Sequence, residues 1–334
     1  MAGTSPAMTT DGFQPWLVKS VESKPPDNGP ARRPDDWRRP EASMSAFDRA
    51  LSSFRSATRH LSVLRIAIVL AVGSALVFAL AGRPLTAPLP NTIKLTDMTW
   101  LEVRSAIDHG YTRVIVPSGG VEQNGPHMIL GKHDHIVGWT AERIAAELGQ
   151  TLIAPVVSFV PQGDYAPPSG NLRFSGTLGV PDAVFAGVLE GIARSLKSAG
   201  FKTICFIADH GGSARPQAEV AARLSREWAG EGVRVISVDD YYFAAGEAQT
   251  KFLEGQGETL STIGQHAGIT DTSELMAVHP AGVDLDRLAQ LPFSLEATGF
   301  DGDPRRATAE RGKALLELKV QAAVRQIRAA SPSM

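Results

Sequence analysis

Short apolar runs alternate with longer amphipathic segments over most of the chain. The apolar runs, rich in β-branched residues, are residues 112–117, 151–160, 202–208 and 233–239. The amphipathic segments, with apolar residues at helical spacing, are residues 99–110, 136–149, 181–200, 215–230, 272–279 and 305–330. Continuous apolar strands that alternate with amphipathic helices are typical of a mostly parallel sheet covered by helices on both faces. The pattern predicts one α/β domain over residues 95–330.

The segment before this domain has a different composition. Residues 1–43 are rich in Pro, Asp, Arg and Ser and lack apolar periodicity, which is typical of disorder. Residues 44–65 are arginine-rich, and residues 66–82 form an apolar run. This succession indicates the basic n-region and apolar h-region of a signal peptide, or a membrane anchor. Residues 83–94 are a Pro-containing linker.

The positive flank of the apolar run predicts export. Basic flanks stay in the cytoplasm, so the domain is expected outside it, either in the periplasm or anchored at the membrane. Met44 stands just before the basic region and is a hypothetical translation start. Residues 1–43 would then lie upstream of the natural protein.

Charge and cysteine content exclude some classes of function. The formal net charge is -2, and no part of the domain is basic enough to indicate nucleic-acid binding. The single cysteine, Cys205, lies in the apolar run "TICFI" and is expected to be a buried small hydrophobe. One cysteine excludes an intrachain disulfide framework and a cysteine-rich zinc site.

Metal-capable side chains gather after two of the predicted strands. They are Glu122, His127, His133, Asp134 and His135 in "GGVEQNGPHMILGKHDHIVGW", His210 in "DHGGS", and His266 and Asp271 in "QHAGITDTSE". The carboxyl ends of parallel strands meet at one edge of a sheet, so these groups are expected to converge. Imidazoles mixed with carboxylates suit Zn²⁺ or Mn²⁺ better than Ca²⁺ or Mg²⁺. Such an ion with an open coordination position would acidify a bound water.

Each of these residues also has a plain structural interpretation. A loop histidine such as His127 or His135 is more often hydrogen-bonded or solvated than a ligand. Glu122 could cap a turn, and Asp271 could be the N-cap of the helix that follows it. No spacing here is as diagnostic as HExxH. The residues alone favour a metal-dependent hydrolase.

Four ordered blocks resemble the creatininase (creatinine amidohydrolase) family. The family's first block reads roughly E-Q-H-G-P-H-L-P-L-G-T-D, and this chain has "EQNGPHMILGKH" from Glu122 to His133. "FSGT" at 174–177 is similar to the family's F-P-G-T, and "ADHGGS" at 208–213 to its N-G-H-G-G-N. "HAGITDTS" at 266–273 is similar to its H-A-G-x-x-E-T-S.

The resemblance implies a single-domain α/β/α sandwich that assembles as a homo-oligomer, often a hexamer. It also implies a paired metal site that hydrolyses C–N bonds. Glu122 and His210 match the family's ligands, and Asp271 stands where the family has a Glu. His266 matches a histidine that moves protons in creatininase. Gly212 stands where creatininase has an additional acidic ligand.

Two ligand positions depart from the family. Asn124 stands where the family has a His, and His133 stands where it has the Asp that can bridge two metal ions. A neutral imidazole has one lone pair and cannot bridge. Either Asp134 takes over the bridge, or the site holds one ion. Zn²⁺ or Mn²⁺, as one or two ions, is expected on Glu122, His133, His210, Asp271 and Asp134.

The leading functional interpretation is an exported metal-dependent amidohydrolase. It would hydrolyse the amide or cyclic amide bond of a small molecule or peptide, with Glu122 and His266 as catalytic residues. Creatinine itself is not expected, because "STIGQH" lacks the aromatic residues that creatininase has near its proton-shuttling histidine. The alternative is a catalytically silent member of the family that binds a small molecule at the altered site.

Overall fold

The computed structural model describes residues 87–288 and 294–331. The predictions for residues 1–43, 44–65 and 66–82 lie outside these ranges, as do residues 83–86 of the linker. Within the described ranges, no helix has the length and apolar character needed to span a membrane.

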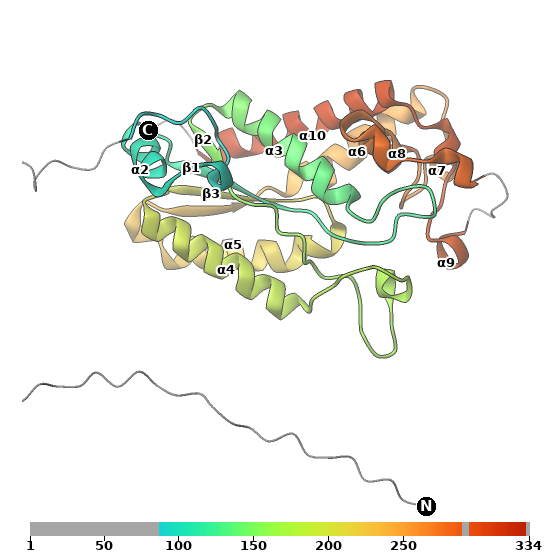
Figure 1. Ribbon diagram of the computed structural model, residues 1–334, viewed down its shortest axis with the longest axis horizontal. Helices are drawn as coiled ribbons and strands as arrows, with labels where there is room; N and C mark the ends of the chain where they lie inside the picture. Colours follow the sequence, from blue (N-terminus) through green and yellow to red (C-terminus); the bar gives the residue numbers. More distant parts are fainter. Residues whose placement is uncertain (1–86, 289–293, 332–334) are drawn as a thin grey trace, which may run out of the picture. The chain divides into compact units, whose positions relative to one another are not determined.

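Four parallel strands form the central sheet, in the order β2-β1-β3-β4 (Figure 1). The strands are β1 (Arg113–Ser118), β2 (Thr151–Ile153), β3 (Thr203–Ala208) and β4 (Arg234–Ser237). Ile115 of β1 pairs with Ile153 of β2 on one side and with Cys205 of β3 on the other. All four predicted strands are present, and Cys205 is a buried free thiol as expected.

Helices cover both faces of the sheet, as the α/β prediction required. In Figure 1, α4 (Asp182–Ala199) and α5 (Ala214–Glu227) lie below the sheet, and α3 (Lys132–Leu148) and α10 (Ala309–Ala330) lie above it. The other α-helices within the described residues are α2 (Trp100–Asp108), α6 (Phe243–Glu254), α7 (Leu260–Ile263), α8 (Ile269–Val278) and α9 (Leu295–Thr298).

Alternation along the strands divides the core between these two layers. Val114 and Val116 of β1 pack in the cluster that contains Phe185 of α4. Ile115, which points to the opposite face, packs in the cluster that contains Val137 of α3 and Val320 of α10. Since both faces are buried, the strands read as continuous apolar runs rather than alternating ones.

Three of the element boundaries that differ from the prediction bear on the site. The strand expected over 151–160 ends at Ile153, because Pro155 has no N–H to continue the ladder. Helix α3 begins at Lys132 rather than at Ile136, so its first turn includes residues that were expected in a loop. Helix α8 begins at Ile269, which places Asp271 within its first turn rather than at its N-cap.

Helices α8 and α10 approach each other closely at a glycine. A Cβ atom added to Gly312 of α10 would lie 1.8 Å from the carbonyl oxygen of Ser273 in α8. No side chain larger than hydrogen fits there without moving a helix. This contact fixes α10 against the helix that carries Asp271.

The strand order places the functional groups. The chain leaves β1 through α3 to β2, then returns through α4 to β3 on the other side of β1. The carboxyl ends of β1 and β3 therefore border a point where the connections diverge, the usual position of a ligand site in open α/β sheets. Asp209 and His210 directly follow β3, and Glu122 follows β1 closely.

Candidate functional site

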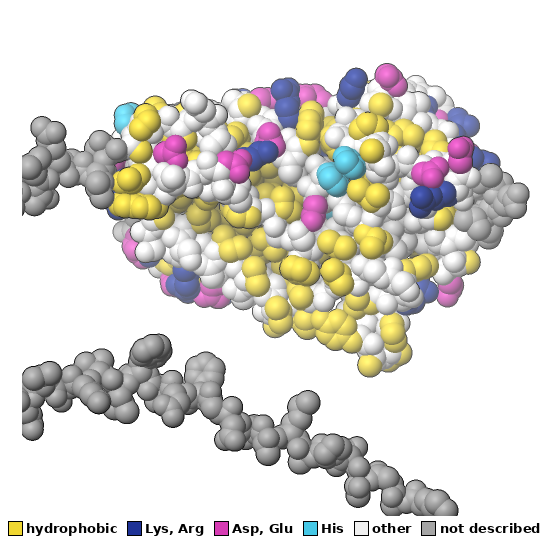
Figure 2. All heavy atoms as spheres, viewed as in Figure 1, with side chains coloured by type: hydrophobic (Ala, Val, Ile, Leu, Met, Phe, Trp, Pro, Cys, Tyr) yellow, Lys and Arg dark blue, Asp and Glu magenta, His cyan; other side chains and the backbone are white. Residues whose placement is uncertain are grey.

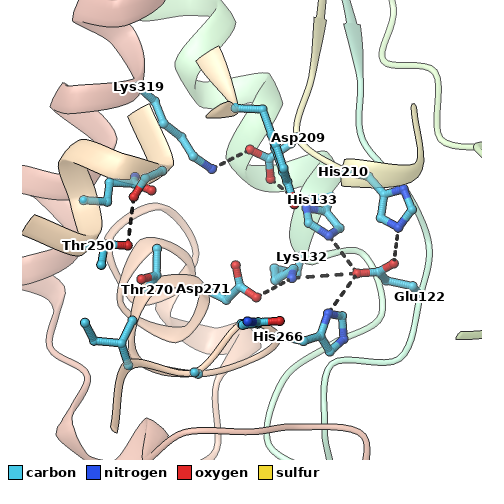
Figure 3. Close-up of a pocket in the computed structure, with 18 of the residues that line it drawn as sticks. Glu122, Lys132, His133, Asp209, His210, Thr250, His266, Thr270, Asp271 and Lys319 are labelled. Carbon is cyan, nitrogen blue, oxygen red and sulfur yellow. Dashed lines mark hydrogen bonds and ion pairs between the residues drawn. The ribbon is translucent and has the colours of Figure 1, made fainter. Parts of the chain in front are cut away.

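A pocket of about 420 Å³ opens beyond the ends of β1 and β3 (Figure 3). Five of the residues predicted from the sequence line it: Glu122, His133, His210, His266 and Asp271. Lysines and an aspartate that were not predicted also line it: Lys132, Lys319 and Asp209. Segments far apart in the sequence thus meet at this edge, as the convergence of strand ends predicted.

Glu122 is the fully buried centre of the cluster. Its Oε1 lies 2.7 Å from Nε2 of His133, and its Oε2 lies 2.9 Å from Nε2 of His210. Asn171 donates to Oε2 over 2.7 Å. Burial alone would raise the pKa of Glu122, but the charge and hydrogen bonds of His133 and the hydrogen bond from His210 hold it well below its usual range. Glu122 is therefore a carboxylate that only accepts hydrogen bonds.

His133 bonds two carboxylates at once. Its Nε2 faces Glu122, and its Nδ1 lies 2.7 Å from Oδ2 of Asp209. Burial and the charge of Lys132 lower its pKa, but Glu122 and Asp209 outweigh them and raise it to about 9. Each ring nitrogen has a carboxylate acceptor, so both carry a proton and the ring is an imidazolium.

Lys132, at the start of α3, is a buried ammonium. Its Nζ lies 2.9 Å from Oδ2 of Asp271 and 3.8 Å from Oε1 of Glu122. Only 1% of its side chain is exposed. Burial would lower its pKa, yet the charges of Asp271 and Glu122 raise it, so the ammonium is retained. The Oδ2 atom of Asp271 also accepts from the N–H of Ala267 over 2.7 Å.

A second buried ion network adjoins the first. Nζ of Lys319 in α10 lies 2.7 Å from Oδ1 of Asp209 and 2.9 Å from Oε2 of Glu274 in α8. The hydroxyl of Tyr241 donates to Oδ1 of Asp209. Burial raises the pKa of Glu274 to about 7. Asp209 links the two networks because its other oxygen accepts from His133.

His266 lies at the pocket wall as a neutral imidazole. Its Nε2 lies 2.9 Å from the carbonyl oxygen of Gln123, which can only accept, and 3.0 Å from the side-chain amide nitrogen of the same residue, which can only donate. The shorter contact favours the tautomer with the proton on Nε2, which is assigned here on that basis. Nδ1 is left with a lone pair and lies 3.9 Å from Oε1 of Glu122. Burial and the charge of Lys132 lower the pKa of His266. Its side chain remains 18% exposed to the pocket.

The other predicted candidates do not line the pocket. The Asn124 amide donates to the carbonyl oxygens of Glu122 and Ile129, at 2.9 and 3.1 Å, and so holds the loop between them. Asp134 accepts from the N–H of Gly120 through Oδ1. His127 is buried, with its Nε2 3.1 Å from the hydroxyl of Thr272. His135 stacks on His279.

These donors do not fit a divalent metal ion. A metal-binding histidine must offer a lone pair, whereas both nitrogens of His133 donate to carboxylates. Asp271 is paired with an ammonium, and the amide nitrogen of Asn124 and the Oδ1 atom of Asp134 are bound to backbone groups. Among the residues that the structure describes, no group of three or more His, Cys, Asp or Glu side chains is arranged to hold a metal ion.

Sequence comparison identifies relatives over most of the domain. The family model of creatininase, described as creatinine amidohydrolase, matches residues 96–327. Creatinine amidohydrolase of Pseudomonas putida is 24% identical over 261 residues, which cover 73% of this chain and 99% of that protein. The mycofactocin precursor peptide peptidase of Mycolicibacterium smegmatis is 26% identical over 240 residues, covering 66% of this chain and 85% of that protein.

Comparison with solved structures finds the same family of relatives as the sequence comparison. A crystal structure of creatinine amidohydrolase superposes with a TM-score of 0.60 at 24% identity, covering 73% of this chain and all of the other. The solved neighbours include a Mn form and a Zn–Zn form of creatininase, which associates divalent cations with this fold. The match to the family model confirms the resemblance that the four sequence blocks indicated. The chain belongs to the creatininase family.

Proposed function

We propose that this protein hydrolyses a C–N bond of a small amide, cyclic amide or short peptide in the pocket beside Glu122. The observation that carries the proposal is the pair formed by His266 and Glu122. An imidazole lone pair and a carboxylate oxygen lie 3.9 Å apart at a pocket wall, which leaves both within hydrogen-bonding reach of one water. The named activities of the two relatives, an amidohydrolase and a peptidase, support this reaction class.

The residues present can carry out the steps. Nδ1 of His266 accepts a proton from the water while its oxygen forms a bond to the amide carbon. The ammonium of Lys132 lies in the pocket wall and stabilises the negative charge that develops on the carbonyl oxygen. The C–N bond then breaks, and His266 returns the proton to the leaving nitrogen. Glu122 holds the water through Oε1.

The sequence predicted that Zn²⁺ or Mn²⁺ would activate this water. The metal forms of the structural neighbours support a divalent cation in the family, but the donor set of this chain does not form a cage for one. No step of the proposed reaction is therefore assigned to a metal.

A substrate screen tests the proposal. The purified full-length chain should release amine from at least one member of a library of small amides, cyclic amides and short peptides. His266→Asn should abolish that release, and His135→Ala, at an exposed histidine outside the pocket, should not. If no member is hydrolysed, or if His266→Asn hydrolyses as fast as the wild type, the proposed reaction is wrong.

A silent small-molecule binder is the second candidate, and one observation favours it. At two positions of family ligands, the amide nitrogen of Asn124 and both ring nitrogens of His133 already have internal partners. Thermal-shift measurements with the same library separate the two functions. A silent binder would gain stability with a ligand that it never converts.

Export and self-assembly are proposed from separate features. The arginine-rich and apolar segments of residues 44–82 support an exported or membrane-anchored domain. Figure 2 shows hydrophobic side chains gathered over α4 and the loop before it. Several are half exposed there: Phe159 56%, Tyr165 58%, Leu178 48%, Val184 50% and Val188 43%. An apolar patch of this kind supports burial against another copy, as a homo-oligomer requires.

A further inference from the structure

We infer that Lys132 and His133 supply the positive charge that metal ions supply in the Mn and Zn forms of creatininase, so that this site is built to work without a bound divalent metal. The inference does not depend on the proposed reaction. It holds equally for a hydrolase and for a silent binder.

Lys132 places a positive charge between two acidic side chains of the pocket. The family block has a Thr at this position, and this chain has a lysine whose ammonium lies between Asp271 and Glu122. Both of these acids match acidic positions of the family. The Lys132 ammonium therefore lies between two acidic side chains that match acidic positions of the family. A metal ion that approached these two carboxylates would come close to the ammonium.

The negative charges of the site are already balanced by cationic side chains. Each carboxylate of these two networks already has a cationic partner within 2.9 Å: Glu122 has His133, Asp271 has Lys132, and Asp209 and Glu274 have Lys319. A divalent ion at Glu122 would lie close to the Lys132 ammonium and the His133 ring, and at such distances like charges in a buried site repel strongly.

Two further ligand positions of the family lack the family's donor. Asn124 has no imidazole, and its amide nitrogen is bound to backbone carbonyls, as described above. At Gly212, where creatininase has an acidic ligand, a Cβ atom would lie 2.8 Å from Cε1 of His210 and 2.8 Å from the carbonyl oxygen of Pro161. No carboxylate side chain fits at that position without a shift of backbone. The metal-free state is thus built into the backbone as well as the charges.

Metal analysis of the full-length chain tests the inference. After equilibration with Zn²⁺ or Mn²⁺ and desalting, the wild type should hold less than about 0.1 ion per chain, and neither metal nor chelator should change its Tm. The triple variant Asn124→His, Lys132→Thr, His133→Asp restores the first family block. It should hold at least about tenfold more metal, and its Tm should rise with added metal.

A single substitution provides a second test that does not depend on folding of the triple variant. Lys132→Met leaves Asp271 and Glu122 facing each other without an ammonium. Its Tm should fall and should recover when Zn²⁺ or Mn²⁺ is added, whereas Lys251→Met, at an exposed lysine, should behave as the wild type. A wild type that retains about one ion per chain after desalting and loses Tm with chelator would overturn the inference. A Lys132→Met variant whose Tm does not change on addition of Zn²⁺ or Mn²⁺ would also overturn the inference.

Discussion

Lys319 donates from the last helix of the domain to Asp209 at the end of strand β3, over 2.7 Å. The same ammonium reaches Glu274 in α8, so one side chain ties a strand end to two helices. All three groups are buried. The ion pairs of the site therefore also hold the C-terminal helix α10 against the strand end and α8.

Removing this ammonium should destabilise the fold strongly. Lys319→Met keeps most of the side-chain volume but leaves Glu274 without its cation and Asp209 with His133 as its remaining cationic partner. Breaking a buried pair in this way costs about 3–5 kcal/mol. Urea unfolding followed by circular dichroism measures the loss. Lys313→Met, at an exposed position of the same helix, should change the free energy of unfolding by less than about 0.5 kcal/mol.

Activity should depend on neutral His266. Because burial and Lys132 lower its pKa, kcat should be constant at neutral pH and fall only when the pH drops below the ordinary histidine value of 6.5. His266→Asn should reduce kcat by about 10²–10⁴-fold, the usual contribution of a general base. A pH–rate profile whose acidic limb lies above 6.5 would contradict this assignment.

Stability should fall as the pH rises past neutral. His133 has a folded-state pKa of about 9, raised above 6.5, so the folded state binds its proton more tightly than the unfolded state. Its contribution is complete below pH 6.5 and is lost as the pH rises through 9. The free energy of unfolding should decline by about 3 kcal/mol across that window. In His133→Gln, whose amide does not titrate, this decline should disappear.

A pair of glycine substitutions should act in opposite directions. Gly312→Ala would force a methyl group against the carbonyl of Ser273, so the α8–α10 contact must open, at a cost of several kcal/mol, roughly that of an overpacked core. Gly191→Ala in α4 meets nothing within 4 Å and should stabilise the protein by up to about 1 kcal/mol through helix propensity. Thermal unfolding of the two variants provides the comparison.

Export can be tested with a fusion. A reporter enzyme that is active only outside the cytoplasm, joined after Ala330, should be active in cells that express the native gene. Replacing Arg59 and Arg65 by acids should weaken this activity, because basic flanks hold the preceding segment in the cytoplasm. A cytoplasmic product without reporter activity would contradict the proposed location.

The fold could be predicted from the sequence because its signals are local. Apolar runs and helical periodicity need only neighbouring residues, and they located every strand of the sheet. Helix α6 was not predicted, and β2 is shorter than expected because Pro155 was not weighed against the apolar run. The convergence of Glu122 and His210 followed from strand ends alone, without knowledge of side-chain contacts.

The cations of the site could not be predicted in the same way. Lys132 and Lys319 find their partners across large sequence separations, 110 positions between Lys319 and Asp209. One sign was present: Lys319 stands among Leu315, Leu316 and Val320, on the apolar face of its helix. A lysine in such a position requires a buried carboxylate. The sequence gives no indication of which carboxylate it meets.

The amide of Asn124 has a consequence for how this site could have arisen or could change. A histidine there cannot donate two protons from one nitrogen to the carbonyls of Glu122 and Ile129. A histidine at position 124 would therefore lose at least one of these two contacts to the loop. The single substitution Asn124→His would weaken the loop contacts, and the Lys132 ammonium would still repel a metal ion. Such a variant would have neither the loop contacts nor a bound metal. Restoring the family's first ligand block would therefore take substitutions at Asn124, Lys132 and His133 together.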